Sequence, residues 1–209
     1  MIKSVGYSDQ EILKNIIKLH CSTDIELDPC YSTGKFYKEG VKDPPNKFDI
    51  DPQAPGVLKS DARSLPFGDE TFNTIMFDPP FVATTGPSLD RKNYKGNVIA
   101  RRFGVFPNES ELFSFYADSM KEFYRLLKPN GILIFKCQDK ISSGKQYFSH
   151  VFIINEAIKL GFYAHDLFIL IAKNRISAGW QLIKQQHCRK FHSYFLVLRK
   201  CNKKIVYTK

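Results

Sequence analysis

Residues 72–81 read Phe72-Asn73-Thr74-Ile75-Met76-Phe77-Asp78-Pro79-Pro80-Phe81, and this stretch decides the fold. Its aromatic and β-branched residues favour an extended strand over 71–77. Two consecutive prolines stop that strand, because neither has a backbone N–H to give to a sheet. Asp78 therefore stands directly after an apolar strand, and we expect it at the edge of a sheet instead of in a surface turn.

Shorter apolar segments upstream end in the same way. In a mainly parallel sheet the carboxyl ends of the strands share one edge, and ligands bind there. The sequence therefore predicts a single acidic edge that includes Asp78. Its other members follow three predicted strands: Asp28 after 25–27, Asp49 or Asp51 after 48–50, and Asp61 after 57–59.

Helical patterns alternate with these strands. Ser8-Asp9-Gln10-Glu11 is a capping box that begins a helix over about 9–20, and Asn108 caps a second helix that runs to about Leu127. The alternation predicts one α/β domain over 1–209 with a Rossmann-like, mainly parallel sheet and an antiparallel last strand. The stretch 35–46 is too short and too rich in proline for the usual first helix. Further elements are expected as strands at 132–135, 167–172 and 191–198, and as a helix at 150–160 closed by Gly161.

Composition and charge narrow the class of protein. The chain has 209 residues, of which 43% are apolar, so it resembles an ordinary globular domain. It shows no signal sequence and no apolar run long enough to span a membrane, and its five scattered cysteines suggest reduced thiols in a cytoplasmic protein.

The net charge of +10 is concentrated in two regions. Residues 173–209 hold ten bases and no acid, so residues 1–172 are neutral, and the long loop 82–107 forms a second basic region. Such clusters are typical of a surface that binds a polyanion. Charge alone leaves open a solvated face or an anionic membrane surface.

The tetrapeptide Asp78-Pro79-Pro80-Phe81 suits attack by an amino group attached to a nucleobase ring. That nitrogen is a poor nucleophile because its lone pair is delocalised into the ring. Hydrogen bonds from its N–H groups to a carboxylate and a rigid main-chain carbonyl would localise the lone pair, and the Phe81 ring could stack on an extruded base. A second Asp-Pro-Pro, at 43–45, follows no apolar strand and is interpreted as a loop without chemistry.

Residues 78–81 resemble the DPPY/F motif of S-adenosylmethionine-dependent methyltransferases that act on exocyclic amino groups of bases. Residues 28–34 resemble the cofactor loop D-P-F-x-G-S-G of that family, with Ser32 where glycine is usual. Residues 48–52, 60–62 and 126–133 resemble further segments of the same class I methyltransferase fold. The resemblance covers roughly 23–200, is closest to small bacterial and phage DNA adenine methylases, and implies S-adenosylmethionine as the cofactor.

The resemblance also implies a role for each matching residue. Asp49, with Asp51 as the alternative, would bind the ribose hydroxyls, and Asp61 would pair with the adenine amino group of the cofactor. The implied catalytic residues are Asp78, Pro79, Pro80 and Phe81. The implied cofactor-binding residues are Asp28, Pro29, Cys30, Tyr31, Thr33, Gly34, Asp49, Asp51, Asp61 and Ala62.

Basic residues near these segments are candidates for contact with nucleic acid. In the loop 82–107, the rings of Tyr94, Phe103 and Phe106 suit a lid over an extruded nucleotide or ordinary loop anchoring. A metal site is not expected, because His187, Cys188 and His192 lack a second ligand pair at zinc spacing. The nucleic-acid-binding candidates are Arg91, Lys92, Arg101, Arg102, Lys136, Arg189, Lys190 and His192.

The expected activity is methyl transfer to the N6 amino group of adenine in DNA. The same motif occurs in RNA methyltransferases that act on guanine N2 or adenine N6, and an inert nucleic-acid-binding module is a third possibility. The chain has no segment long enough for a separate target-recognition domain. That favours RNA, a DNA enzyme of low sequence specificity, or a partner subunit or second copy that supplies recognition.

Overall fold

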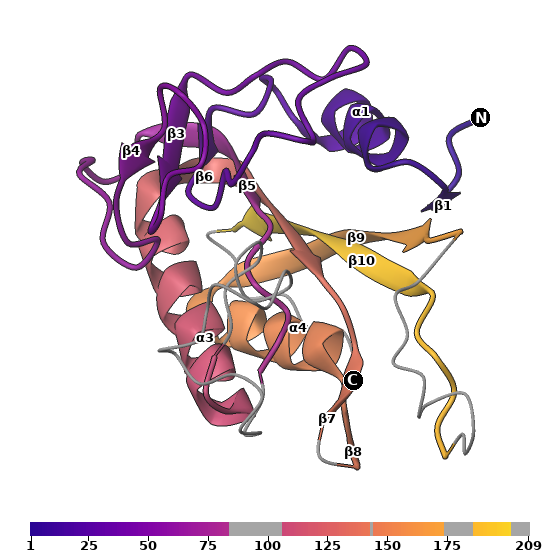
Figure 1. Cartoon of the computed structure of the whole chain (residues 1–209). Coiled ribbons are helices and arrows are strands. Elements are labelled where there is room, and N and C mark those ends of the chain that lie inside the picture. Colours follow the sequence, from indigo (N-terminus) through magenta and orange to yellow (C-terminus); the bar gives the residue numbers. More distant parts are fainter. Residues whose placement is uncertain (84–105, 143, 174–185, 202–209) are drawn as a thin grey trace.

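A computed structural model gives the structure of the protein and describes residues 1–83, 106–142, 144–173 and 186–201. The helices α3 and α4 lie on one side of the main sheet and α1 on the other (Figure 1). The elements in chain order are β1 (Val5–Gly6), α1 (Asp9–His20), β2 (Leu27–Asp28), β3 (Asn46–Asp49), β4 (Leu58–Lys59), β5 (Phe72–Phe77), α3 (Glu109–Leu126), β6 (Leu127–Cys137), β7 (Lys140–Ser142), β8 (Lys145–Tyr147), α4 (Ser149–Leu160), β9 (Phe162–Ile171) and β10 (His192–Lys200).

The main sheet has eight strands in the order β1-β9-β10-β6-β5-β2-β3-β4. Strands β4, β3, β2, β5 and β6 are parallel, while β10 is antiparallel to both of its neighbours, β6 and β9. This confirms the predicted α/β class and the antiparallel last strand. The strand order reverses between β2 and β5, so the ligand crevice of such a sheet is expected beyond their carboxyl ends.

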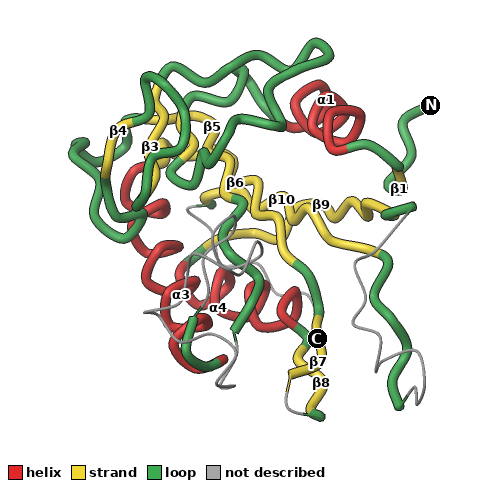
Figure 2. The backbone as a smooth tube through the Cα atoms, in the orientation of Figure 1, coloured by secondary structure: helices red, strands yellow, loops and turns green. Residues whose placement is uncertain are grey.

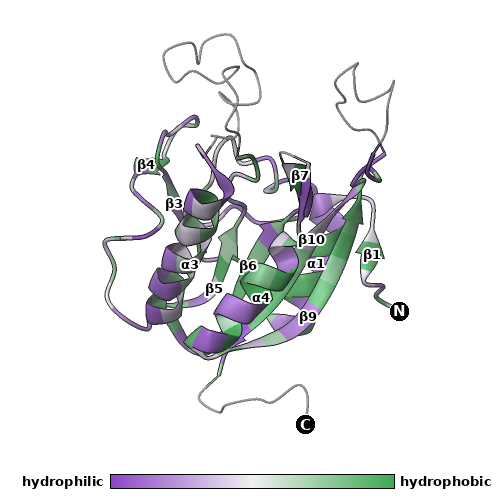
Figure 3. Ribbon diagram, turned by 90° about the horizontal axis from the view of Figure 1, so that it is seen from below, coloured by the Kyte–Doolittle hydropathy of each residue, from purple (hydrophilic) through white to green (hydrophobic). Residues whose placement is uncertain are grey.

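Alternation along β6 builds two cores, one on each face of the sheet. Ile132 and Ile134 pack into the core that contains the apolar face of α1. Leu133 and Phe135 point the other way, into the larger core that contains the buried faces of α3 and α4. Figure 3 shows the largely apolar strands of the sheet behind α3 and α4, which carry both hydrophilic and apolar residues. The resulting layers hold the strand ends of the acidic edge rigidly in place.

The three described helices begin and end where the sequence predicts. The Ser8 side chain accepts a hydrogen bond from the Glu11 N–H, and Asn108 Oδ1 accepts one from the Glu111 N–H at 2.9 Å. Helix α4 ends at Gly161, whose φ of 103° lies in the left-handed region that favours glycine. Local capping chemistry therefore fixes these boundaries.

Some strands differ from the expectation. Strand β6 begins at Leu127 instead of 132, because it includes the expected turn at 128–131. The register of its pairing with β5 shifts there, and Asn130 has a φ of 65°. Strand β9 begins five residues earlier than expected, at Phe162. The short β1 and the β7–β8 hairpin were not predicted, because few of their residues are apolar.

The connection from β2 to β3 contains no helix, as expected from its length and prolines (Figure 2). Its apolar side chains take over the packing that a helix would provide. Val41 is buried in the same core as α1, and Phe36 and Tyr37 pack against that core. The missing helix is therefore replaced on this side of the sheet by packed apolar and aromatic side chains.

Candidate active site

The four acids predicted for one edge of the sheet lie at neighbouring strand ends. Asp28 is the last residue of β2, Asp49 is the last of β3, and Asp78 directly follows β5. Asp61 lies two residues beyond β4. Since β4, β3, β2 and β5 are adjacent and parallel, the acids share the carboxyl edge on both sides of the order reversal.

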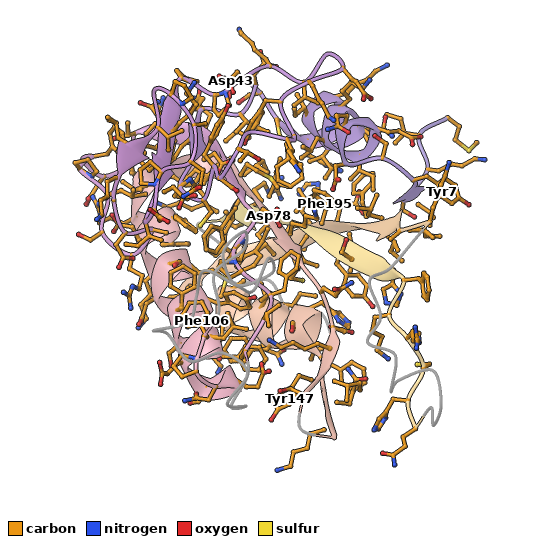
Figure 4. All side chains as sticks on the ribbon, viewed as in Figure 1. Tyr7, Asp43, Asp78, Phe106, Tyr147 and Phe195 are labelled. Carbon is orange, nitrogen blue, oxygen red and sulfur yellow. The ribbon has the colours of Figure 1, made fainter. Side chains whose placement is uncertain are left out.

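Asp78 lies near the middle of the molecule in the view of Figure 4. Its side chain is 25% exposed, yet its Oδ1 atom is buried and has no hydrogen-bond partner among the described residues. Burial raises the pKa of this carboxyl to about 6; Lys136 opposes the rise and Asp9 adds to it. A buried acceptor without a partner is costly unless a ligand supplies the donor.

Lys136 is the cation nearest to Asp78. Its Nζ lies 3.0 Å from Asp9 Oδ1 and 3.9 Å from Asp78 Oδ2. The ammonium also lies over the rings of Phe36 and Phe195, at 4.7 and 5.4 Å from their centroids. The side chain is only 12% exposed and lies against Asp9 and Asp78, so it is not placed on the surface where a phosphate would bind.

Asp28 is 1% exposed and is the last residue of β2. Its Oδ1 accepts the Cys30 N–H at 2.9 Å, and its Oδ2 accepts the Tyr37 hydroxyl at 2.5 Å. Burial raises the pKa of Asp28 to about 7; the two hydrogen bonds lower it, while the charges of Asp78 and Asp49 raise it. No described cation pairs with this carboxylate, so a cationic ligand group would relieve its buried charge.

The predicted cofactor loop has the backbone of a tight cradle. Gly34 has a φ of 66°, a left-handed conformation that favours glycine, and a Cβ there would lie 2.3 Å from the Tyr31 hydroxyl oxygen. Ser32 has a φ of 52°, also in the left-handed region. That conformation explains why glycine is usual in the resembling family. The Ser32 N–H donates to Asp49 Oδ2 at 2.8 Å, which ties the loop to the end of β3.

The two candidates for a ribose contact differ in their surroundings. Asp49 is half-buried and is joined to the cofactor loop through Ser32. Asp51 is exposed and accepts a hydrogen bond from Gln53 on the outside of the turn. The burial and the link to the loop favour Asp49 as the residue that would face a ligand.

Asp61 already has a charged partner. The Arg63 side chain forms an ion pair with it at 2.6 Å, and the Arg63 N–H donates to Asp61 Oδ1 at 2.9 Å. These contacts lower the pKa of Asp61. Ala62 beside it is buried. A contact between Asp61 and an adenine amino group therefore requires an oxygen lone pair that Arg63 leaves free, or a shift of Arg63.

The second Asp-Pro-Pro has a structural role that the sequence analysis missed. Asp43 accepts the hydroxyl of Tyr31 at 2.6 Å and an ammonium hydrogen of Lys47 at 2.7 Å. The Tyr31 ring stacks on Tyr37, with an interplanar angle of 6° and a centroid distance of 5.4 Å. Asp43 thus holds Tyr31 against Tyr37, and Tyr37 in turn donates a hydrogen bond to Asp28. Only the tertiary fold brings these residues together.

The main-chain carbonyls after Asp78 differ in their partners. The Tyr116 hydroxyl donates to Pro80 O at 2.7 Å, and Lys140 Nζ donates to Phe81 O at 2.8 Å. No described residue donates to Pro79 O. The half-buried Phe81 ring stacks on no described aromatic ring. Neither Tyr116 nor Lys140 carries a sequence signal that would have identified it.

The basic residues predicted to bind nucleic acid differ in where the structure places them. The amino end of β10, which follows Arg189 and Lys190 and begins at His192, lies beside the carboxyl end of β6, on the same edge as Asp78. Lys200 lies at the opposite end of β10, where it is buried against Glu70 and Leu127 O, so part of the basic segment is internal. Arg91, Lys92, Tyr94, Arg101, Arg102 and Phe103 lie outside the described residues.

Two further observations concern only the described part of the chain. It contains no group of three or more His, Cys, Asp or Glu side chains that could hold a metal ion. None of its helices has the length and apolar character needed to cross a bilayer.

Neither protein-family models nor curated protein sequences match this sequence. Solved structures do match the fold. TrmN from Thermus thermophilus aligns with a TM-score of 0.54 at 15% identity, over 91% of this chain and 48% of its own. The methyltransferase solved with the Trm112 activator of Haloferax volcanii aligns with a TM-score of 0.52 at 12% identity, over 91% and 93% of the two chains.

A third structure, the [4+2]-cyclase SpnF, aligns with a TM-score of 0.52 at 14% identity, over 92% of this chain and 80% of its own. The chain thus has the Rossmann-like fold of the S-adenosylmethionine-dependent methyltransferases. It spans about half the length of TrmN. Because a cyclase shares the fold, the fold does not determine the reaction, and the function must be argued from the site.

Proposed function

We propose that this protein is an S-adenosylmethionine-dependent methyltransferase of nucleic acid, and that its target is the N6 amino group of adenine in DNA. The observation that carries the proposal is the buried Asp78 Oδ1, which lacks a partner, directly after β5 at the point where the strand order reverses. An amino group has two N–H donors. Asp78 Oδ1 and Pro79 O are two acceptors on one rigid segment that suit them.

The residues of the edge fit the cofactor. Asp28 is a buried carboxylate without a described cationic partner, and Gly34, at a φ of 66°, lets the loop after β2 turn tightly beside it. Asp49 stands at the end of the next strand, with its carboxylate facing the same loop. When bound, S-adenosylmethionine supplies an electrophilic methyl group on a sulfonium. Asp28 would then be the counter-ion for its positive charge.

Asp78 and its neighbours would activate the target amine. Hydrogen bonds to Asp78 Oδ1 and Pro79 O hold the nitrogen so that its lone pair is no longer shared with the ring. As the new N–C bond would form, the methyl–sulfur bond of the sulfonium would break and leave its electron pair on sulfur. The amine nitrogen would gain positive charge, which the Asp78 carboxylate would stabilise until the nitrogen loses a proton. The Phe81 ring is available to stack on the base, which is worth about 1–3 kcal/mol.

The decisive experiment compares Asp78→Ala with the unmodified protein. We expect methyl transfer to fall by at least about a hundredfold, as for other lost transition-state contacts. Cofactor affinity, measured by isothermal titration calorimetry, should be retained, because Asp78 contacts the amine and not the cofactor. Asp118→Ala is the control, since Asp118 is an acid on the outside of α3 that forms an ion pair with Lys121.

Radiolabelled methyl transfer should be measured on DNA and RNA in parallel, followed by nucleoside analysis of the product. N6-methyladenine in DNA is the expected product. Transfer to RNA alone would show that the substrate is RNA instead of DNA, while the proposed methyl transfer to an amino group would stand. Undiminished transfer by Asp78→Ala would exclude the catalytic assignment.

A further inference from the structure

Two buried side chains hold the main chain directly after the catalytic acid. Tyr116 reaches Pro80 O from the middle of α3, and it is buried among the aromatic residues of the larger core. Lys140 reaches Phe81 O from the first residue of β7. These two bonds come from separate elements and meet on consecutive residues of the motif, so they fix the path of the chain from Pro80 to Phe81.

Lys140 is itself held by a second buried charge. Its Nζ lies 2.6 Å from Glu109 Oε2, and the two side chains are 14% and 10% exposed. The ammonium also lies 5.9 Å from the centroid of the Phe113 ring. Burial lowers the pKa of Lys140, and Glu109 counters that effect and favours the charged form.

Stability alone does not account for this ion pair. Removing two charges from water costs several kcal/mol per ion, and apolar residues of similar volume are often as stabilising as a buried pair. A charged pair at this position is therefore explained better by the hydrogen bonds that the Lys140 ammonium makes besides its ion pair with Glu109. One of them binds the Phe81 carbonyl.

We propose that Tyr116 and Lys140, with Glu109, are positioning residues for the transfer reaction, which is an inference that rests on the proposed function. They occupy the carbonyls of Pro80 and Phe81, whereas Pro79 O stays available for the target amine beside Asp78 Oδ1. They also fix the backbone that carries the Phe81 ring. None of the three contacts the cofactor or the base.

The consequence is measurable because alignment of the reacting atoms contributes much of the rate. A displacement of about 1 Å can cost on the order of a hundredfold in rate. Losing either hydrogen bond frees one carbonyl and loosens one residue of the motif. We expect a fall in kcat of about tenfold or more, with the KM for S-adenosylmethionine unchanged.

The test uses Tyr116→Phe, Lys140→Met and the double variant Lys140→Met/Glu109→Leu. The double variant replaces the buried charges by apolar side chains, which restores the stability that the single lysine variant loses. A merely structural pair would recover kcat together with the unfolding temperature. A positioning pair recovers the unfolding temperature only. Matched controls are Tyr124→Phe on the same helix and Lys145→Met in the same hairpin.

The outcomes separate this inference from the proposed function. If the unmodified protein transfers methyl groups and the double variant has full kcat, the positioning roles are excluded and the function stands. The positioning roles are also excluded if Tyr116→Phe has full kcat. If the unmodified protein transfers no methyl group to DNA or RNA, the function fails, and the positioning roles fail with it.

Discussion

The ionisation of Asp78 depends on one buried cation. Lys136 lowers the pKa of this carboxyl against the effect of burial, and the balance leaves the pKa at about 6. The charged carboxylate is the form that stabilises positive charge on the amine. The rate of transfer should therefore fall as the pH falls through about 6, because the protonated acid no longer carries that charge.

Replacing Lys136 by Met should move the acidic limb of the pH–rate profile to higher pH. The change removes the nearby positive charge and so raises the pKa of Asp78, while the methionine side chain can fill the space between Phe36 and Phe195. The profile of kcat/KM between about pH 5 and 8 measures the shift. Lys136→Arg keeps the charge and serves as the control. An acidic limb at the same pH in both variants would contradict this role of Lys136.

The position of a single residue could be predicted from the sequence where the path of the main chain alone determines it. Asp28, Asp49, Asp61 and Asp78 were recognised as acids that end apolar strands, and a parallel sheet places such ends on one edge. Their partners were not predictable. Tyr37, Lys136 and Lys140 lie far from Asp28, Asp78 and Phe81 in sequence or follow no periodic pattern, and only folding brings them together.

At the scale of elements, the β2–β3 connection replaces a helix by an aromatic pair that depends on Asp43. Asp43→Ala removes the acceptor of the Tyr31 hydroxyl and loosens the stack on Tyr37, which binds Asp28. Asp43 is largely exposed, so the loss should be only about 0.5–1 kcal/mol. That corresponds to a cofactor affinity about two- to fivefold weaker.

Isothermal titration calorimetry with S-adenosylmethionine measures this loss, and kcat at saturating cofactor should be unchanged. The control is Asp24→Ala, since Asp24 forms an exposed ion pair with Lys42 and has no link to the aromatic pair. Equal affinities in Asp43→Ala and in the unmodified protein would show that Asp43 does not support the cofactor loop.

Elements were predictable in proportion to their length and periodicity. The three described helices have an apolar face and a capping residue, which is Ser8 before α1, Asn108 before α3 and Gly161 after α4, and both signals are local. Short strands have neither signal: the β7–β8 hairpin depends on pairing between Lys140–Ser142 and Lys145–Tyr147. That pairing matters most for the site, because it delivers Lys140 to Phe81.

Over the whole molecule, the sheet determines on which side the basic residues of the last segment lie. The amino end of β10 lies on the edge that carries Asp78, whereas Lys200 is buried at the other end of the same strand. Among the described bases of the last segment, Arg189 and Lys190 lie just before the end of β10 that shares an edge with Asp78. The net charge overstates the surface available to a polyanion, because it counts buried bases as well.

The salt dependence of nucleic-acid binding tests this assignment. Each phosphate contact contributes about 0.7–0.9 to the slope of log affinity against log salt concentration, because binding releases condensed counterions. The double variant Arg189→Ala/Lys190→Ala should therefore weaken binding equally for different sequences and reduce the slope by about 1.4–1.8. Fluorescence anisotropy at several salt concentrations, on duplexes with and without adenine, measures both effects.

The matched control removes the same charge from the opposite side of the molecule. Lys121→Ala/Lys159→Ala removes two exposed bases near the C-terminal ends of α3 and α4. These helix ends lie away from the edge of the sheet that carries Asp78. If net charge alone governed binding, the two double variants would have the same slope. A lower slope confined to the Arg189 and Lys190 variant would place the nucleic acid across the edge that carries Asp78, because counterion release reports phosphates in contact with the protein and not its total charge.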